Sequence, residues 1–201
     1  MSKMMMTAVA LAALCAGGTA SATADPAYAH PGTVNGASYT FEAIATGDVY
    51  AYFMSESAAY TEVLGMSTAN STTPIGAVGL NNQTSHRGQS IDLGHVTAGE
   101  IVTFFIKVSN TGLTFSSQKS LNADGSQHIY STSYAGSVSP YIPMGTFISF
   151  EDLTTRSSDH DYNDTAFVVT DVRAVPEPGS VALMLGGLAL VGAAARRRRA
   201  R

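Results

Sequence analysis

The chain has 201 residues, a formal net charge of −4, one cysteine and no tryptophan. Residues 25–175 hold 14 acidic and five basic side chains. This segment therefore has a net charge of −9, over a length typical of one domain. The acidic excess argues against nucleic acid and anionic membrane surfaces as its partners, and it makes a cation the natural counterpart.

Residues 1–24 have the pattern of a secretory signal peptide. Lys3 gives a positive start, an apolar stretch follows, and small residues come next. These small residues offer cleavage sites after Ala22, Ala24 and Ala29. We expect cleavage after Ala24, with the other two sites as alternatives. Cys15 would leave with the signal peptide, so the exported chain must be stabilised by its core, a metal or partners.

Segments of alternating apolar and polar residues recur along the next 150 or so residues, as in half-buried β-strands. The clearest is 101–108, in which Val102, Phe104, Ile106 and Val108 share one face. Further strands are predicted at residues 39–44, 49–54, 60–66, 91–96, 128–134, 145–150 and 165–172. No interior stretch shows a helical period. Many short strands joined by turns predict an all-β fold, an antiparallel β-sandwich or jelly roll.

One turn has a specific sequence signature. Asn122, Asp124 and Gly125 predict a hairpin turn in which the glycine takes a positive φ. His128 follows three residues later, and we expect a half-buried strand histidine there. The alternative places its ring against the acidic residues described next.

The densest group of polar side chains lies between residues 150 and 164. Asp159, Asp161 and Asn163 are two residues apart, so an extended segment points them to one side. Carboxylate and amide oxygens are the ligands that Ca²⁺ prefers. The sequence therefore predicts a Ca²⁺ site with the candidate ligands Glu151, Asp152, Asp159, Asp161, Asn163 and Asp164.

Two alternatives stay open for these residues. In the first, Asp and Asn side chains cap turns and accept backbone N–H bonds without a metal. In the second, a pair such as Asp159 and Asp161 hydrolyses glycosidic bonds, although the missing tryptophan argues against it. The segment is not an EF-hand, since Asp164 stands where the turn glycine belongs. No nucleophile elbow, P-loop or zinc motif is present, and we expect that the protein is not an enzyme.

The acidic segment also resembles a known family. F-E-D-L at residues 150–153, followed by D-x-D-Y-N-D at 159–164, is similar to the signature of the DUF4114 family. The stretch 120–128 also fits a pattern seen in such proteins, and the resemblance covers residues 102–172. It implies a β-rich domain of unknown function, found in exported bacterial proteins that include large calcium-dependent adhesins. It marks the six acidic-segment residues as those of the family signature, and it implies no reaction.

The C-terminal residues form a three-part tail. Pro176, Glu177 and Pro178 come first, an uncharged Gly- and Ala-rich run follows, and the basic residues Arg196, Arg197, Arg198 and Arg199 end it. We expect a transmembrane helix at 180–195, slightly shorter than the ~20 residues of a full span, with the arginines on the cytoplasmic side. An ordinary single-span anchor is the alternative. The order of parts resembles the PEP-CTERM sorting signal of Gram-negative bacteria, which a membrane protease-transpeptidase called exosortase recognises.

Together these features predict a signal peptide at 1–24, a β-sandwich domain at 25–174 and a sorting signal at 175–201. The precursor is held transiently in the inner membrane and processed by an exosortase, and it then reaches the cell surface or extracellular matrix. We expect a structural or adhesive role, with Ca²⁺ as a stabilising ion. The alternative is a Ca²⁺-dependent carbohydrate-binding module for exopolysaccharide, which uses the acidic segment or the polar loop at 67–89. Glycoside hydrolase is the third possibility.

Overall fold

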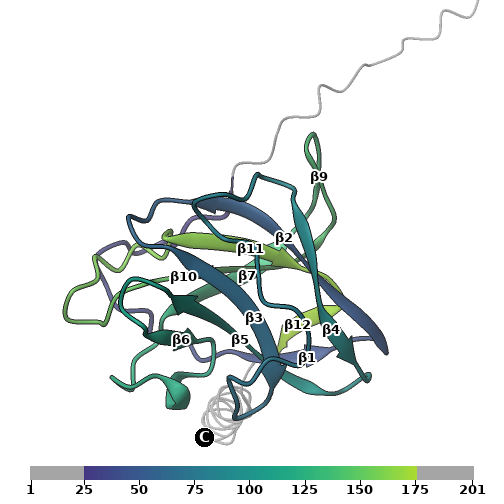
Figure 1. Ribbon diagram of the computed structural model, residues 1–201, viewed down its shortest axis with the longest axis horizontal. Coiled ribbons are helices and arrows are strands. Elements are labelled where there is room, and N and C mark those ends of the chain that lie inside the picture. Colours follow the sequence, from purple (N-terminus) through teal and green to yellow (C-terminus); the bar gives the residue numbers. More distant parts are fainter. Residues whose placement is uncertain (1–24, 176–201) are drawn as a thin grey trace, which may run out of the picture.

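The computed structural model describes residues 25–175, which form two five-stranded antiparallel sheets packed face to face (Figure 1). The first sheet has the order β12 (Val172–Val175), β1 (Thr40–Ala43), β5 (Ile101–Val108) and β3 (Glu62–Thr68), and β6 (Thr114–Ser116) also pairs with β5. The second has the order β4 (Ser90–Val96), β2 (Gly47–Glu56), β11 (Thr165–Val169), β10 (Gly145–Phe150) and β7 (Ile129–Tyr134). A 3₁₀ turn, η1 (Lys119–Leu121), follows β6, and a separate hairpin joins β8 (Ser137–Val138) to β9 (Tyr141–Ile142). The predicted all-β antiparallel sandwich is confirmed.

The main core lies between the two sheets. The predicted inward face of β5 is confirmed, since its alternate residues Val102 to Val108 are all buried there. Phe104 packs edge-on against Phe41 of β1, with ring centroids 5.3 Å apart. From the opposite sheet, Phe53 and Phe167 enter the same core. Burial of these apolar side chains is the chief force that holds the sheets together.

A second apolar cluster covers the outer face of the second sheet. It consists of Met54, Tyr134, Ile142, Phe147, Ala166 and Val168. The N-terminal segment lies over the same face, where the ring of Tyr28 is 5.4 Å from that of Tyr130. Because the sheet is covered on both sides, all five residues of β11 are buried.

The last predicted strand, 165–172, divides into two. β11 ends at Val169 in the second sheet, and β12 begins at Val172 in the first. Between them Asp171 has φ 57°, a left-handed conformation that reverses the chain direction and that Asp tolerates better than most residues. Its carbonyl accepts a hydrogen bond from the N–H of Ile44 at 2.8 Å. The prediction of one continuous strand is therefore wrong.

The predicted turn before β7 is confirmed in part. Gly125 has φ 64°, and its N–H donates to the carbonyl of Asn122 at 2.9 Å. The flanking strands β6 and β7 belong to different sheets, so this turn carries the chain across the sandwich and is not a hairpin.

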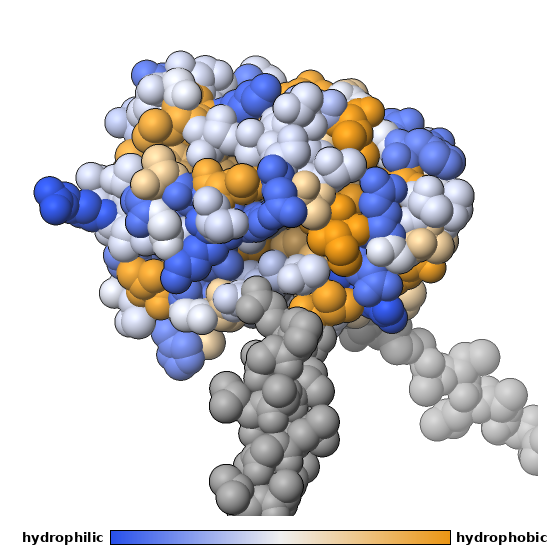
Figure 2. All heavy atoms as spheres, turned by 90° about the horizontal axis from the view of Figure 1, so that it is seen from below, coloured by the Kyte–Doolittle hydropathy of each residue, from blue (hydrophilic) through white to orange (hydrophobic). Residues whose placement is uncertain are grey.

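Figure 2 shows a face on which small groups of hydrophobic residues alternate with hydrophilic ones. Such a mixture is ordinary for a surface in water. Among residues 25–175, none of the helical segments reaches the length and hydropathy needed to cross a membrane. The predicted signal peptide, and the predicted helix at 180–195, lie outside the described residues.

Candidate functional site

The acidic segment is the loop that connects β10 to β11. The two strands are paired neighbours, and Phe150 lies opposite Thr165 in their register. The loop therefore leaves and re-enters the second sheet at the same end. Glu151 and Asp152 directly follow β10, and Asp164 directly precedes β11. This arrangement brings Asp152 next to Asp164, although the two are 12 positions apart in the chain.

Three of the six predicted ligands form one group. One carboxylate oxygen from each of Glu151, Asp159 and Asp161 lies within 4.8 Å of the other two. Ca²⁺ binds oxygen at roughly 2.3–2.6 Å, so two ligands of the same ion are at most about 5 Å apart. The spacing fits such an ion. Burial, with the negative charges of Asp159 and Glu151, raises the pKa of Asp161.

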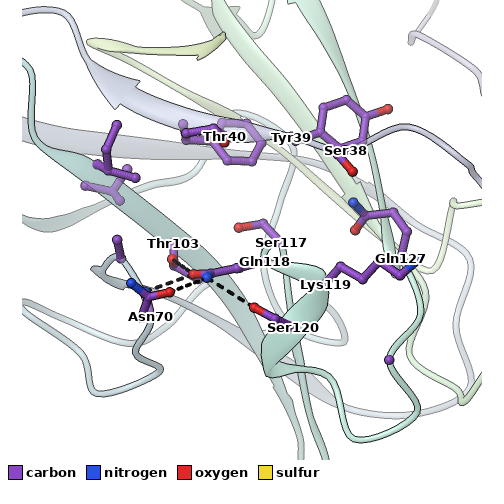
Figure 3. A pocket seen from close by; sticks show the side chains of 15 residues that line it. Ser38, Tyr39, Thr40, Asn70, Thr103, Ser117, Gln118, Lys119, Ser120 and Gln127 are labelled. Carbon is purple, nitrogen blue, oxygen red and sulfur yellow. Dashed lines mark hydrogen bonds between the residues drawn. The ribbon is translucent and has the colours of Figure 1, made fainter. Parts of the chain in front are cut away.

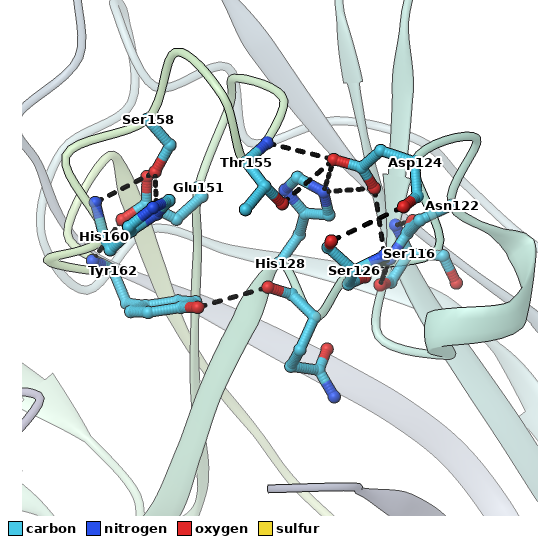
Figure 4. A network of polar contacts seen from close by, with 11 residues as sticks. Ser116, Asn122, Asp124, Ser126, His128, Glu151, Thr155, Ser158, His160 and Tyr162 are labelled. Carbon is cyan, nitrogen blue, oxygen red and sulfur yellow. Dashed lines mark hydrogen bonds and ion pairs between the residues drawn. The ribbon is translucent and has the colours of Figure 1, made fainter. Parts of the chain in front are cut away.

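Glu151 is the buried member of the group and is held by its own loop. Its Oε1 accepts the backbone N–H of Tyr162 at 2.5 Å, and its Oε2 accepts the hydroxyl of Ser158 (Figure 4). Ser158 Oγ also accepts the N–H of His160 at 2.9 Å and lies 2.9 Å from its Nδ1. These contacts fix one side of the group, while Asp159 stays exposed to solvent.

The turn that presents Asp161 has an unusual backbone. His160 and Tyr162, on either side of it, have φ values of 59° and 56°, in the left-handed region. The buried Tyr162 hydroxyl accepts the N–H of Asn35 at 2.8 Å and donates to the carbonyl of Gln127 at 3.2 Å. The loop is thereby tied to two distant segments of the chain.

The other three predicted ligands lie differently. Asn163 is exposed, and its side-chain amide donates to the Asp161 carboxylate. Asp152 and Asp164 are outside the three-carboxylate group; the N–H of Asp152 donates to Oδ2 of Asp164 at 2.7 Å. Burial raises the pKa of Asp164, and the charges of Asp152 and Glu151 raise it further.

Glu62, which interacts with Asp152 and Asp164, was not among the site residues predicted from the sequence. Glu62 of β3 is fully buried, and burial together with the carboxyls of Asp152 and Asp164 raises its pKa. The signal was present in the strand pattern, because Glu62 alternates with Leu64 and Met66 on the inward face. An acidic residue at a core position of a strand is rare without a partner.

His128 differs from both expectations. It precedes β7, is 1% exposed and packs its ring against Phe115, with centroids 4.3 Å apart. Its Nε2 lies 3.0 Å from the carboxylate of Asp124. The histidine is therefore fully buried and faces the turn, and it is not part of the three-carboxylate group.

A groove of about 570 Å³ opens on the first sheet (Figure 3). Hydroxyl and amide side chains line much of it. Gln118 accepts the N–H of Asn70 at 2.9 Å, and its amide donates to Ser120 Oγ at 3.2 Å. Tyr39 and Lys119 also border the groove, and none of the six predicted metal ligands does.

The predicted sorting residues Pro176, Glu177 and Pro178, and the basic residues Arg196, Arg197, Arg198 and Arg199, lie outside the described residues. They are tested by comparison with known families. The PEP-CTERM protein-sorting motif matches residues 174–199. This match shows an exported protein whose C-terminal signal is processed at the membrane by an exosortase.

A second family match covers most of the described domain. The domain of unknown function DUF4114 matches residues 44–171, which begins well before the resemblance noted at 102–172 and adds β2, β3 and β4. No curated protein and no solved structure matches the chain. The chain belongs to the DUF4114 family and carries a PEP-CTERM sorting motif.

Proposed function

We propose that this exported protein is a structural or adhesive component of the cell surface or extracellular matrix, and that Ca²⁺ stabilises its acidic loop. The observation that carries the proposal is the group of Glu151, Asp159 and Asp161, whose oxygens lie within 4.8 Å of one another. The sorting motif supports an extracellular position. Extracellular Ca²⁺ modules typically bind with dissociation constants of about 10⁻⁴–10⁻³ M.

The ion would act by joining the two ends of the loop. Glu151 extends from the end of β10, whereas Asp159 and Asp161 lie on the returning arm. Without a cation, three negative charges at this spacing repel one another. Binding would remove that repulsion and fix the loop to β10 and β11 of the second sheet. A rigid, less negative surface suits a module that packs against matrix polymers.

Chelation of Ca²⁺ is the direct test. At a hundredfold excess over its dissociation constant, a ligand adds about 2.7 kcal/mol of stability, which shifts the melting temperature of a domain of this size by about 5–10 °C. We expect the full-length protein to lose this increment when a chelator is added. Asp161→Ala should melt, with or without Ca²⁺, at the same temperature as the wild type does in the presence of chelator.

Asp48→Ala provides a matched control, since it removes an exposed carboxylate on β2 that pairs with His95. This variant should keep the full response to Ca²⁺. A wild-type melting curve that is the same with Ca²⁺ and with excess chelator would contradict stabilisation of the protein by Ca²⁺.

Carbohydrate binding is a second candidate, and the polar groove supports it. Neutral sugars are bound through hydroxyl and amide groups, which Asn70, Gln118 and Ser120 supply, and Tyr39 adds an aromatic ring at the edge. Exopolysaccharide is the proposed ligand, and the sorting motif, which marks an exported protein, supports this choice.

A polysaccharide pull-down separates the possible binding sites. Retention that is lost in Gln118→Ala but survives chelation would assign binding to the groove. Retention that is lost on chelation would assign it to the acidic loop. Absence of retention under both conditions leaves the structural role as the proposal.

The proposed function includes no catalysis. A glycoside hydrolase places its two carboxyls on either side of the scissile bond, within reach of the sugar. Glu62 has the raised pKa of such a group, but it is 0% exposed and a saccharide cannot reach it. Release of reducing sugar from any retained polysaccharide would contradict this view.

A further inference from the structure

The groove on the first sheet contains a buried side-chain acceptor without a partner. Gln127, which lies between the turn at Gly125 and β7, lines the groove and is 4% exposed. Its Nε2 donates to the carbonyl of Ala37 at 3.2 Å. Because a carbonyl oxygen can only accept, this bond fixes which end of the amide faces Ala37. The other end, Oε1, has no hydrogen-bond partner within residues 25–175.

An acceptor in this position favours a ligand that carries hydrogen-bond donors. A buried amide oxygen has given up its bonds to water, and the loss is recovered only when a donor reaches it. The hydroxyl groups of a saccharide are donors of this kind. A hydroxyl bound at the floor of the groove would therefore supply the partner that Gln127 lacks.

The charge of the groove differs from that of the domain around it. Residues 25–175 have a net charge of −9, yet Lys119 is the only charged side chain among the described residues that line the groove. Lys119 is exposed, and it forms no ion pair with any residue between 25 and 175. In Figure 3, Lys119 and Gln127 both lie at the end of the groove away from Asn70. A free cation and a free acceptor thus occupy the same end.

The carboxylates that are neighbours of lining residues in the sequence are already engaged. Glu42 pairs with Arg173 at 3.1 Å, and Glu100 accepts the N–H of Thr97 at 2.9 Å. Asp124 is held by its contacts with the acidic loop and with the histidine before β7. At physiological ionic strength, charges more than about 8 Å away are largely screened. An anionic group that enters the groove therefore meets the charge of Lys119 before that of the remaining acidic residues.

We propose that the groove binds an acidic saccharide, in which the carboxylate of a uronic acid pairs with Lys119 and a hydroxyl donates to Oε1 of Gln127. The ring of Tyr39, on the other side of the groove, would pack against a face of the sugar (Figure 3). We base this on the carbohydrate-binding role proposed above and add the chemical class of the ligand. None of the three carboxylates of the outer group lines the groove, so Ca²⁺ is not required.

The test compares soluble oligosaccharides that differ only in the charged group. Oligomers of galacturonate and of mannuronate are each paired with the same oligomer after reduction of its carboxyl groups to primary alcohols. Binding to the full-length chain, purified in detergent, is measured by calorimetry in the presence of a chelator, which prevents bridging by Ca²⁺. We expect at least one acidic form to bind about two- to fivefold more tightly than its reduced form, the range of an exposed ion pair. The preference should weaken as salt is added.

Three variants assign the contacts. Lys119→Gln should bind the acidic form no more tightly than the reduced form. Lys107→Gln is the matched control, since it removes an exposed lysine from β5 of the same sheet, outside the groove, and it should keep the preference. Gln127→Leu should weaken the binding of both forms by about three- to tenfold, the range of one hydrogen bond. Circular dichroism checks that this buried variant is folded, and the exposed Lys119 provides the test that does not depend on it.

Equal binding of the acidic and reduced forms by the wild type would overturn the acidic ligand and leave carbohydrate binding in place. A preference that survives in Lys119→Gln would also overturn the proposal, because the carboxylate would then be recognised elsewhere. Unchanged binding of both forms in a folded Gln127→Leu would overturn the role of the buried acceptor. Binding of neither form by the wild type would overturn saccharide binding in the groove altogether and leave the structural role with Ca²⁺ untouched.

Discussion

Asp124 accepts both the backbone N–H and the hydroxyl of Thr155, at 3.0 and 3.1 Å, across 31 residues of sequence. The first residue lies in the turn before β7 and the second in the acidic loop. The same carboxylate contacts Nε2 of the buried His128 (Figure 4). The Asp124 side chain therefore connects the stretch 120–128 to the acidic loop. The loop is held at Thr155 as well as at the strands β10 and β11.

The first prediction concerns the stability of the domain at acidic pH. Burial opposes ionisation of Asp124, but hydrogen bonds from Thr155, His128 and Ser126 outweigh it and hold the pKa of Asp124 well below its usual range. In the unfolded chain an Asp has a pKa of about 3.9, so the unfolded state binds the proton first. The stabilisation is fully present above about pH 4 and is lost as the pH falls further.

Asp124→Asn should therefore be less stable than the wild type by about 1–3 kcal/mol at pH 7, and the difference should shrink below about pH 4. Urea unfolding at a series of pH values measures both curves. Curves that stay parallel from pH 7 to pH 2 would contradict the lowered pKa of Asp124 in the folded protein.

Much of the fold could be predicted from the sequence because it depends on local alternation. The pattern of β5 identified the inward face correctly from Val102 to Val108. The strands β6, β8 and β9 were missed because two or three residues are too short to show a period. The passage of the chain from the second sheet to the first at Asp171 was not predicted, because a single residue with a positive φ divides an otherwise apolar run.

The candidate site could be predicted only within one segment. The spacing of Asp159 and Asp161 pointed to a shared ligand group, which depends on residues close in the chain. Glu62 comes from a different sheet, about 90 residues before Asp152, and its proximity follows from the way the sheets pack. The alternation of apolar and polar residues within a strand does not show which parts of the two sheets face each other.

The second prediction concerns the Tyr162 hydroxyl, which bonds to both Asn35 and Gln127. Tyr162→Phe leaves a buried N–H and a carbonyl without this partner, so we expect a loss of about 1–3 kcal/mol in the free energy of unfolding. Tyr50→Phe is the control, since Tyr50 is 40% exposed and should change stability by less than about 0.5 kcal/mol. Equal effects in the two variants would contradict a structural role for the hydroxyl.

The third prediction concerns the loop after β3, which closes the open edge between the sheets. Gly79 exchanges two backbone hydrogen bonds with Leu64 on one edge strand, at 2.8 and 2.9 Å. On the edge strand of the other sheet, a Cβ built on Gly76 would lie 2.2 Å from the carbonyl oxygen of Leu93. The loop thus covers two edges that would otherwise offer unpaired backbone groups.

Gly76→Ala must push this loop away from β4. We expect a loss of about 1–3 kcal/mol, measured by urea unfolding. Gly47→Ala is the matched control, because its new Cβ would meet nothing within 4 Å. A Gly76 variant as stable as the Gly47 variant would mean that the loop can shift without cost.

The fourth prediction concerns the first residue of the exported chain. Asp25 makes two hydrogen bonds of 2.6 and 2.7 Å to the guanidinium of Arg87, which also donates to the Met54 carbonyl at 3.0 Å. The ring of Tyr28 packs 4.7 Å from that of Tyr162, on the outer face of the second sheet. Cleavage after Ala29 would remove both contacts and uncover this face.

Cleavage after Ala24 keeps them, and we expect the exported protein to begin at Asp25. Its intact mass, measured by mass spectrometry, decides between the three sites, and a chain that begins at His30 would contradict the prediction. A chain engineered to begin at His30 should also melt at a lower temperature. The partly exposed ion pair contributes at most about 1 kcal/mol, so most of that loss should come from the missing Tyr28 ring. Tyr28→Ala should therefore reproduce more of the loss than Asp25→Asn does.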